Sequence, residues 1–161
     1  MSASLNIRFT LNDTAVETRV GTGDSALDVL RREFDLCSVK LACGEGECGA
    51  CTILVDRRTR NGCLMPAVDL EGREVLTLEG LWSETGIDPV QQAFVTAGAV
   101  QCGFCTPGMI LQAKYILSQN KAVSEFDIRR GLEGNICRCT GYEKIVAAVA
   151  MAAAAQRGQD G

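Results

Sequence analysis

The chain has 161 residues, 47% of them hydrophobic and 22% charged, which excludes a disordered polymer and allows one ordinary domain or two small ones. Sixteen basic and twenty acidic residues give a net charge of −4 with no basic stretch, so we expect neither nucleic acid nor an anionic membrane as partner. The longest apolar run, 145–155, is too short to span a bilayer, and no secretory signal is evident. We therefore expect a soluble, cytoplasmic protein without membrane insertion.

The first half of the chain carries the pattern of strands and tight turns. Apolar residues alternate with polar ones from Leu5 to Leu11, which predicts a strand with one buried face, and a second strand follows the turn at 12–13. A short helix is expected after Ser25, with short strands at 52–55 and 75–78. We expect the charged segment 57–62 to be a turn.

The second half carries the pattern of four helices. Asp88-Pro89 and Thr106-Pro107 each read as a capping residue followed by proline, and Ser124 can cap a third helix. The run from Thr140 to Glu143 has the form of a capping box that opens a fourth. Strands followed by helices predict an α+β chain with two domains, residues 1–80 and 81–161.

Nine cysteines and no histidine restrict the chemistry of any metal site. An odd number of cysteines in a reducing compartment does not suit a disulfide framework. The lack of histidine excludes His-ligated zinc, Rieske-type ligation and catalysis by a Ser-His or Cys-His pair. Any metal must therefore be held mainly by thiolates.

The first group of cysteines has the spacing of a plant-type [2Fe–2S] loop, C-x4-C-x2-C, with a fourth cysteine after eleven further residues. Its predicted ligands are Cys43, Cys48, Cys51 and Cys63. Gly44, Gly46 and Gly49 give the loop the conformational freedom to turn backbone N–H groups towards an anionic cluster. A zinc site with four cysteines is the alternative at this loop.

The second group combines C-x2-C with C-x-C, and its predicted ligands are Cys102, Cys105, Cys137 and Cys139. Cys105 precedes the helix expected at Thr106, and Cys139 precedes the capping box at Thr140. Two positive helix ends would then face one negative centre, which indicates a four-helix arrangement with a cluster at one end. On spacing alone, zinc remains open here as well. The ninth cysteine, Cys37, is expected to be a small buried apolar residue.

Three motifs together resemble the iron–sulfur subunit of the molybdenum hydroxylase (xanthine oxidase) family. They are Cys43-Gly-Glu-Gly-Glu-Cys48-Gly-Ala-Cys51-Thr, Gln101-Cys-Gly-Phe-Cys-Thr-Pro-Gly-Met109 and Gly134-Asn-Ile-Cys-Arg-Cys-Thr-Gly-Tyr142. The resemblance covers nearly the whole chain in the family's order. It implies a plant-type ferredoxin β-grasp domain followed by a four-helix-bundle [2Fe–2S] domain.

The same resemblance implies a function and a set of partners. Electrons would pass from a molybdopterin centre, in its cytosine dinucleotide form, through the two clusters to FAD. The molybdopterin belongs to a large partner subunit and the FAD to a medium one, in a dimer of heterotrimers. Gln101 and Cys139 match family residues that contact the pterin, and no substrate chemistry is expected on this chain alone.

The chain departs from the family pattern just before the first ligand, where Ala42 stands in place of the usual glycine. A left-handed conformation would be costly at an alanine, so the entry to the loop is expected to differ slightly. Two alternatives remain open: a free-standing di-cluster ferredoxin that shuttles electrons between other proteins, and a zinc protein without redox chemistry.

Overall fold

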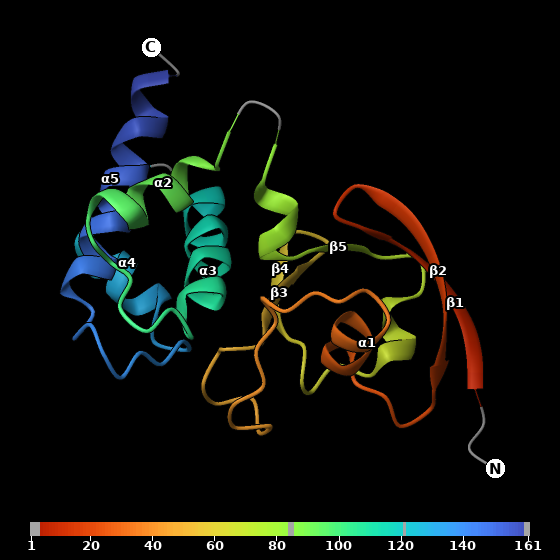
Figure 1. Cartoon of the computed structure of the whole chain (residues 1–161). Helices are drawn as coiled ribbons and strands as arrows, with labels where there is room; N and C mark the ends of the chain where they lie inside the picture. Colours follow the sequence, from red (N-terminus) through yellow and green to blue (C-terminus); the bar gives the residue numbers. More distant parts are fainter. Residues whose placement is uncertain (1–3, 84–85, 121, 160–161) are drawn as a thin grey trace.

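The computed structural model describes residues 4–83, 86–120 and 122–159, and within them five strands form one sheet in the order β2-β1-β5-β3-β4. The strands are β1 (Ser4–Leu11), β2 (Thr14–Gly21), β3 (Thr52–Val55), β4 (Arg58–Asn61) and β5 (Glu74–Leu76). β1 runs antiparallel to β2 and parallel to β5, and β3 is antiparallel to both β4 and β5. The sheet lies at the end of the molecule that holds the N-terminus (Figure 1).

Two tight turns organise the sheet. Asn12 and Asp13 have φ angles of 49° and 65°, and Asp56 and Arg57 have 48° and 62°. Positive φ at both central residues is the mark of the type I′ turn, whose twist matches that of a two-stranded hairpin. The turn predicted at 12–13 is confirmed. The prediction of a turn over 57–62 was wrong, because the chain reverses at 56–57 and continues as β4.

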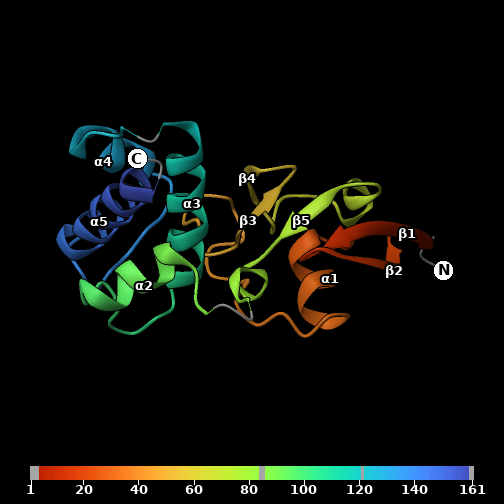
Figure 2. The ribbon, with the colours of Figure 1, turned by 90° about the horizontal axis from the view of Figure 1, so that it is seen from above.

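The five α-helices of the described residues divide between the two halves of the chain. Helix α1 (Ala26–Arg32) lies beside the sheet, and its cap Ser25 forms a capping box with Asp28. The other helices gather at the opposite end of the molecule (Figure 2). They are α2 (Pro89–Thr96), α3 (Thr106–Gln119), α4 (Glu125–Gly131) and α5 (Glu143–Gln159). Two short 3-10 helices, η1 (Ala67–Leu70) and η2 (Leu78–Leu81), flank β5. The predicted α+β class is confirmed.

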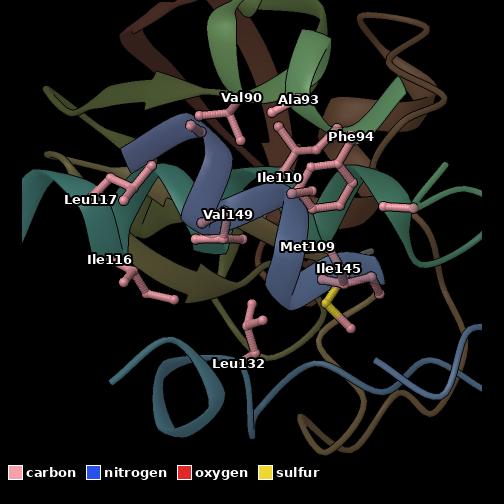
Figure 3. Packing of buried hydrophobic residues seen from close by; sticks show 14 of the residues in the cluster. Val90, Ala93, Phe94, Met109, Ile110, Ile116, Leu117, Leu132, Ile145 and Val149 are labelled. Atoms are coloured by element: carbon pink, nitrogen blue, oxygen red, sulfur yellow. The ribbon is translucent and has the colours of Figure 1, made fainter. Parts of the chain in front are cut away.

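The buried apolar residues form two clusters that share β3. The first cluster lies between the sheet and α1 and includes Ile53 and Val55. The second lies among α2, α3, α4 and α5 (Figure 3). Leu54 belongs to this second cluster. Because side chains alternate across a strand, β3 is buried on both faces. Helix α3 packs against β3 and thereby joins the helices to the sheet.

Of the four helix caps predicted in the second half of the chain, two are formed, at α2 and α4. Asp88 makes a capping box with Gln91 at the start of α2, and its other carboxylate oxygen accepts a bond from Lys114 Nζ of α3 at 2.6 Å. Ser124 caps α4 in the same way, with Asp127. For α3 the cap is Cys105, one residue before the predicted Thr106.

The predicted capping box at Thr140 is wrong, because α5 begins only at Glu143. Gly141 and Tyr142 both have positive φ, at 63° and 69°, and this left-handed turn separates Thr140 from the helix. Within the described residues, no helix is both long and apolar enough to cross a membrane.

Candidate metal centres

The β3–β4 hairpin explains how two cysteines of the first group that are twelve positions apart meet. Cys51 immediately precedes β3, and Cys63 lies two residues after β4. Thr52 is paired with Asn61, and the Gly62 N–H donates to the Cys51 carbonyl at 3.1 Å. The two sulfur atoms of Cys51 and Cys63 therefore lie 3.4 Å apart.

The loop between Cys43 and Cys51 is shaped by glycines and held to the hairpin. Gly44, Gly46 and Gly49 have φ angles of 71°, 81° and 65°, as the sequence predicted for a loop that turns its N–H groups inward. Asn61 Nδ2 donates to the Gly46 carbonyl at 2.8 Å. Ala42 has no positive φ, so the strain expected at the loop entry does not arise.

Backbone N–H groups stabilise one thiolate of the first group strongly. Hydrogen bonding from the Glu45 N–H to the Cys43 sulfur, with help from the Cys48 thiol and N–H, lowers the pKa of Cys43 to about 6. Burial raises the pKa of Cys51 to about 11. Cys43 is therefore prepared as an anionic ligand at neutral pH, whereas Cys51 needs a bound cation to lose its proton.

The second group is assembled from the start of α3 and from the loop that precedes α5. Cys105 is the N-cap of α3, so the positive end of that helix adjoins its thiol. Cys139 lies four residues before α5, so the helix-end argument holds for Cys105 and fails for Cys139. The sulfur atoms of Cys102 and Cys139 are 3.5 Å apart, and the Thr140 hydroxyl donates to the Cys137 sulfur at 3.1 Å.

The pKa values of the thiols differ within the second group as well. Hydrogen bonding from the Phe104 N–H lowers the pKa of Cys102. Burial raises the pKa of Cys105 to about 12. For Cys137, burial raises the pKa, but hydrogen bonds from Thr140 outweigh it and leave the pKa below its ordinary value. Each group thus mixes thiols whose pKa is lowered with thiols whose pKa is raised.

The eight cysteines meet in four pairs. The pairs are Cys43 with Cys48, Cys51 with Cys63, Cys102 with Cys139, and Cys105 with Cys137. In the part of the chain that the structure describes, no three or more Cys, Asp or Glu side chains are arranged to hold a single metal ion. Two pairs per group match the demand of a two-iron cluster, in which each iron takes two thiolates.

The remaining predicted residues are all at the surface. Gln101 is exposed and adjoins Cys102, whose sulfur lies against that of the exposed Cys139. The two predicted pterin contacts are therefore both accessible to a partner. The prediction that Cys37 is buried was wrong: it is exposed in the turn that follows α1, where Asp35 has a φ of 53° and carries the chain away from the core.

Sequence reasoning missed the residues that join the two groups. The Ile136 N–H donates to the Cys48 carbonyl at 2.9 Å, and Asn135 Nδ2 donates to the Gly49 carbonyl at 2.9 Å. The run Gly134-Asn-Ile-Cys places an asparagine close to a predicted ligand. Nothing in that run indicates which distant residue the asparagine contacts. The contact spans 86 residues of sequence.

Two domain families match the chain in succession. Residues 9–77 match the family described as "2Fe-2S iron-sulfur cluster binding domain", and residues 77–150 match the "[2Fe-2S] binding domain". The boundary at residue 77 falls between β5 and η2. Each match contains one complete group of four cysteines.

Small subunits of several known dehydrogenases are similar over nearly the whole chain, two of them as follows. The xanthine dehydrogenase iron-sulfur-binding subunit of Escherichia coli O157:H7 is 46% identical over 147 residues, which cover 90% of this chain and 92% of the relative. The nicotinate dehydrogenase small FeS subunit of Eubacterium barkeri is 44% identical over 145 residues, with the same two coverages. A chain in the crystal structure of quinoline 2-oxidoreductase from Pseudomonas putida 86 superposes with a TM-score of 0.91 at 40% identity, covering 96% of this chain and 98% of that one.

Proposed function

The chain belongs to the iron–sulfur subunits of the molybdenum hydroxylase (xanthine oxidase) family of oxidoreductases, and from this premise we propose that it relays electrons from a molybdopterin centre through two [2Fe–2S] clusters towards FAD. When bound, the clusters would supply one-electron redox chemistry. The protein's part is to hold them with eight thiolates and to fix their surroundings. The second cluster, beside Gln101, would receive the electrons first.

The observation that carries the proposal is the meeting of eight cysteines as four pairs in two separate groups. The proposed ligands of the first cluster are Cys43, Cys48, Cys51 and Cys63. Those of the second are Cys102, Cys105, Cys137 and Cys139. Backbone N–H groups donate to the sulfur atoms of Cys43 and Cys102, and Cys105 lies at the N-cap of α3. Both features favour a negatively charged centre at these groups.

The division into a ferredoxin-like domain of residues 1–80 and a helical four-helix-bundle domain of residues 81–161 is part of the proposal. Two separate buried clusters support it. Two observations argue that the domains do not fold independently of each other. Leu54 of β3 packs with the helices, and the two cysteine loops are hydrogen-bonded to each other. We infer two domains that share a tight boundary.

Exposed apolar side chains around the cysteines support large partner subunits rather than a free-standing ferredoxin. Five large apolar residues, each 42–57% exposed, lie within two positions of a proposed ligand. They are Leu41, Leu64, Val100, Phe104 and Ile136. When a partner subunit covers these apolar side chains, their removal from water stabilises the complex. We propose that the partners are a large molybdopterin subunit, contacted by Gln101 and Cys139, and a medium FAD subunit. The three chains would assemble as a dimer of heterotrimers. A cytoplasmic location stays a prediction.

Metal and acid-labile sulfide analysis of the natively purified protein tests the proposal, together with electron paramagnetic resonance (EPR) after dithionite reduction. We expect about four irons and four sulfides per chain and two distinguishable signals. Copurifying chains should contain molybdenum and FAD. Two signals in a chain that purifies alone would favour the di-cluster ferredoxin, whereas zinc without sulfide in anaerobically purified protein would refute electron transfer.

A further inference from the structure

The loop of the second cysteine group lies directly against the loop of the first. The Ile136 N–H donates to the carbonyl of Cys48, a proposed ligand of the first cluster, at 2.9 Å. Ile136 is itself bonded to Cys137, a proposed ligand of the second. A single hydrogen bond and a short run of covalent bonds therefore connect the two ligand sets.

Asn135 holds this contact in place from a buried position. Its side chain belongs to a residue only 4% exposed, and Nδ2 donates to the Gly49 carbonyl at 2.9 Å and to the Thr52 hydroxyl at 3.2 Å. Its own carbonyl accepts from the Tyr142 hydroxyl at 3.2 Å, and the oxygen of that hydroxyl accepts from the Cys137 N–H at 2.9 Å. Asn135 is thus bonded to the first loop by its side chain and to the second by its backbone.

Glycines allow the two loops and the start of α3 to meet without a side chain between them. A Cβ on Gly108 would lie 2.3 Å from the Gly49 carbonyl oxygen and 3.2 Å from Asn135 Nδ2. A Cβ on Gly49 would lie 2.4 Å from the Gly134 carbonyl oxygen. Contacts this short are not tolerated, so any side chain at either position would push the loops apart.

We propose that Asn135 is the positioning residue for electron transfer between the two clusters, an inference that rests on the proposed function. By fixing the two loops together, it keeps the Ile136–Cys48 hydrogen bond formed as the path between Cys137 and Cys48. One electron crosses at a time: the donor site is oxidised by one electron, the acceptor site is reduced by one, and no bond is made or broken. The rate of such a transfer falls steeply as a bonded contact opens into a gap, which is why a rigid contact matters.

Two substitutions loosen the contact by different means. Asn135→Asp keeps the shape of the side chain but turns a carboxylate oxygen towards the Gly49 carbonyl, so an attraction becomes a repulsion in a buried place. Gly108→Ala leaves the amide intact and inserts a methyl group between the start of α3 and the first loop, against the Gly49 carbonyl and the Asn135 amide. Thr52→Val is a milder case, because it keeps the bond between Asn135 and Gly49. It removes only the Thr52 hydroxyl, which accepts from the same amide at 3.2 Å and donates to the Gly49 carbonyl at 2.7 Å.

Asn61→Asp is the matched control. Asn61 Nδ2 also donates to a carbonyl of the first loop, that of Gly46, at 2.8 Å. Asn61 belongs to β4, and its bond stays within the first half of the chain. The control therefore makes the same chemical change near the same cluster without touching the contact between the loops.

The measurement uses the full chain with whatever partner chains purify with it. EPR of the fully reduced protein reports the magnetic splitting between the clusters, and freeze-quenching after photoreduction reports the rate of electron exchange. We expect Asn135→Asp and Gly108→Ala to weaken the splitting and slow the exchange several-fold, and Thr52→Val to do so less. Asn61→Asp disturbs the first loop alone, so it should alter the first cluster's own EPR signal and leave the splitting and the exchange rate nearest to wild type.

Each outcome decides a different question. Unchanged splitting and exchange in Asn135→Asp, with both clusters in place, would overturn the role of Asn135. If Asn135→Asp or Gly108→Ala fails to assemble its clusters, Thr52→Val decides, and a wild-type exchange rate in that variant would overturn the inference. Absence of both iron–sulfur signals from the wild-type protein would instead refute the proposed function.

Discussion

Glu79 accepts two hydrogen bonds from Ser38, one from its backbone N–H at 2.9 Å and one from its hydroxyl at 2.5 Å. The Thr77 hydroxyl donates to the same carboxylate at 2.7 Å. Glu79 lies in η2, whereas Ser38 lies in the segment that leads into Cys43. The carboxylate therefore ties the entry of the first cysteine loop to the far end of the ferredoxin-like half.

We expect Glu79→Ala to lower the free energy of unfolding by about 1 kcal/mol, since it removes hydrogen bonds to a charged acceptor at a partly exposed site. Urea denaturation would measure the loss. Ser38→Ala and the double variant complete a thermodynamic cycle, and the two single losses should not add, because both remove the same contact. Simple additivity would show that the pair does not stabilise the fold.

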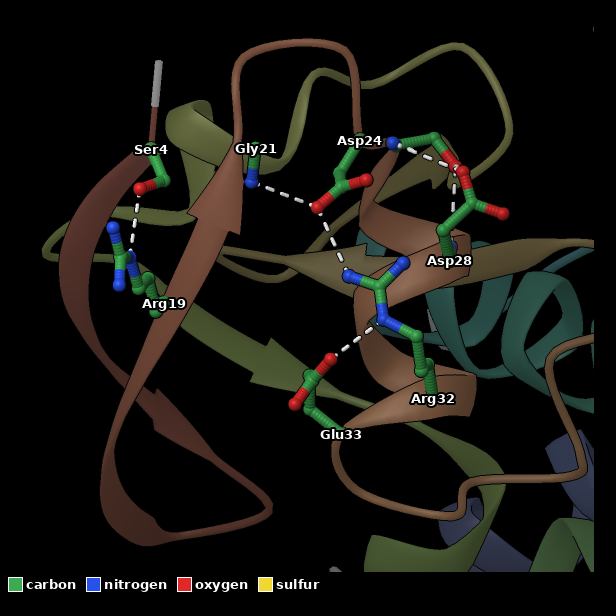
Figure 4. Close-up of polar contacts among 8 residues, drawn as sticks. Ser4, Arg19, Gly21, Asp24, Asp28, Arg32 and Glu33 are labelled. Carbon is green, nitrogen blue, oxygen red and sulfur yellow. Dashed lines mark hydrogen bonds and ion pairs between the residues drawn. The ribbon is translucent and has the colours of Figure 1, made fainter. Parts of the chain in front are cut away.

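Asp24 gives the chain a pH-dependent stability. The Asp24 carboxylate accepts a hydrogen bond from the Arg32 guanidinium at 2.9 Å and another from the Gly21 N–H at 2.8 Å (Figure 4). Together these bonds hold the pKa of Asp24 below its usual value of 3.8. A lowered folded-state pKa means that the stabilisation is complete above the unfolded-state pKa and is lost as pH falls through the folded-state one.

Asp24→Asn should therefore lower the melting temperature at neutral pH, and the difference from wild type should shrink as pH falls below the ordinary carboxyl pKa of 3.8 and through the lowered pKa of the folded state. Thermal unfolding followed by circular dichroism at several pH values measures both. The variant Asp13→Asn is a control on a carboxylate elsewhere in the sheet. A difference in melting temperature that stays constant down to the lowest pH would mean that charge on Asp24 contributes nothing.

Sequence patterns were most reliable where a single local rule decides the structure. The alternation in β1, the turn at Asn12 and the capping boxes at Asp88 and Ser124 all follow from short-range geometry. The same is true of the spacing that brings the cysteines together in two groups. An error arose where a local pattern allowed two structures. The charged segment 57–62 was predicted as a turn, but Asp56 and Arg57 alone make the turn and the residues that follow form β4.

Contacts between distant segments could not be predicted from the sequence. Thr140 has the form of a helix cap, but its hydroxyl donates to Cys137 instead, because the chain turns at Gly141 before α5 begins. Cys37 was predicted to be a buried apolar residue, but it is exposed. Its exposure depends on the direction in which the chain leaves α1, which the local sequence does not determine. The contact of Asn135 with Gly49 depends on how two separate motifs pack, which neither motif encodes alone.

Replacement of single cysteines should separate the two clusters. Cys105→Ser removes a thiol at the N-cap of α3 and should reduce bound iron to about two atoms per chain, with loss of the second cluster's EPR signal. Cys51→Ser should do the reverse and remove the first cluster's signal. Cys37→Ser is the control and should keep both. Equal loss of both signals in each variant would show that the two halves cannot assemble independently.

Gly49 is the position at which the first loop is most sensitive to substitution. It has a φ of 65°, and a Cβ there would lie 2.4 Å from the Gly134 carbonyl oxygen and 2.5 Å from Asn135 Nδ2. Gly72 has nearly the same φ, at 69°, but nothing within 4 Å of an added Cβ. The two glycines therefore differ in crowding and not in backbone strain.

Gly72→Ala should cost only the strain of a left-handed alanine, about 1–2 kcal/mol, and leave both clusters in place. Gly49→Ala should pay the same strain and also separate the two loops, so that iron content falls together with the melting temperature. Iron analysis and thermal unfolding of the two variants, purified in parallel, measure the difference. Equal effects in both would mean that backbone strain alone limits position 49, and that the close approach of the loops at Gly134 and Asn135 can relax without harm.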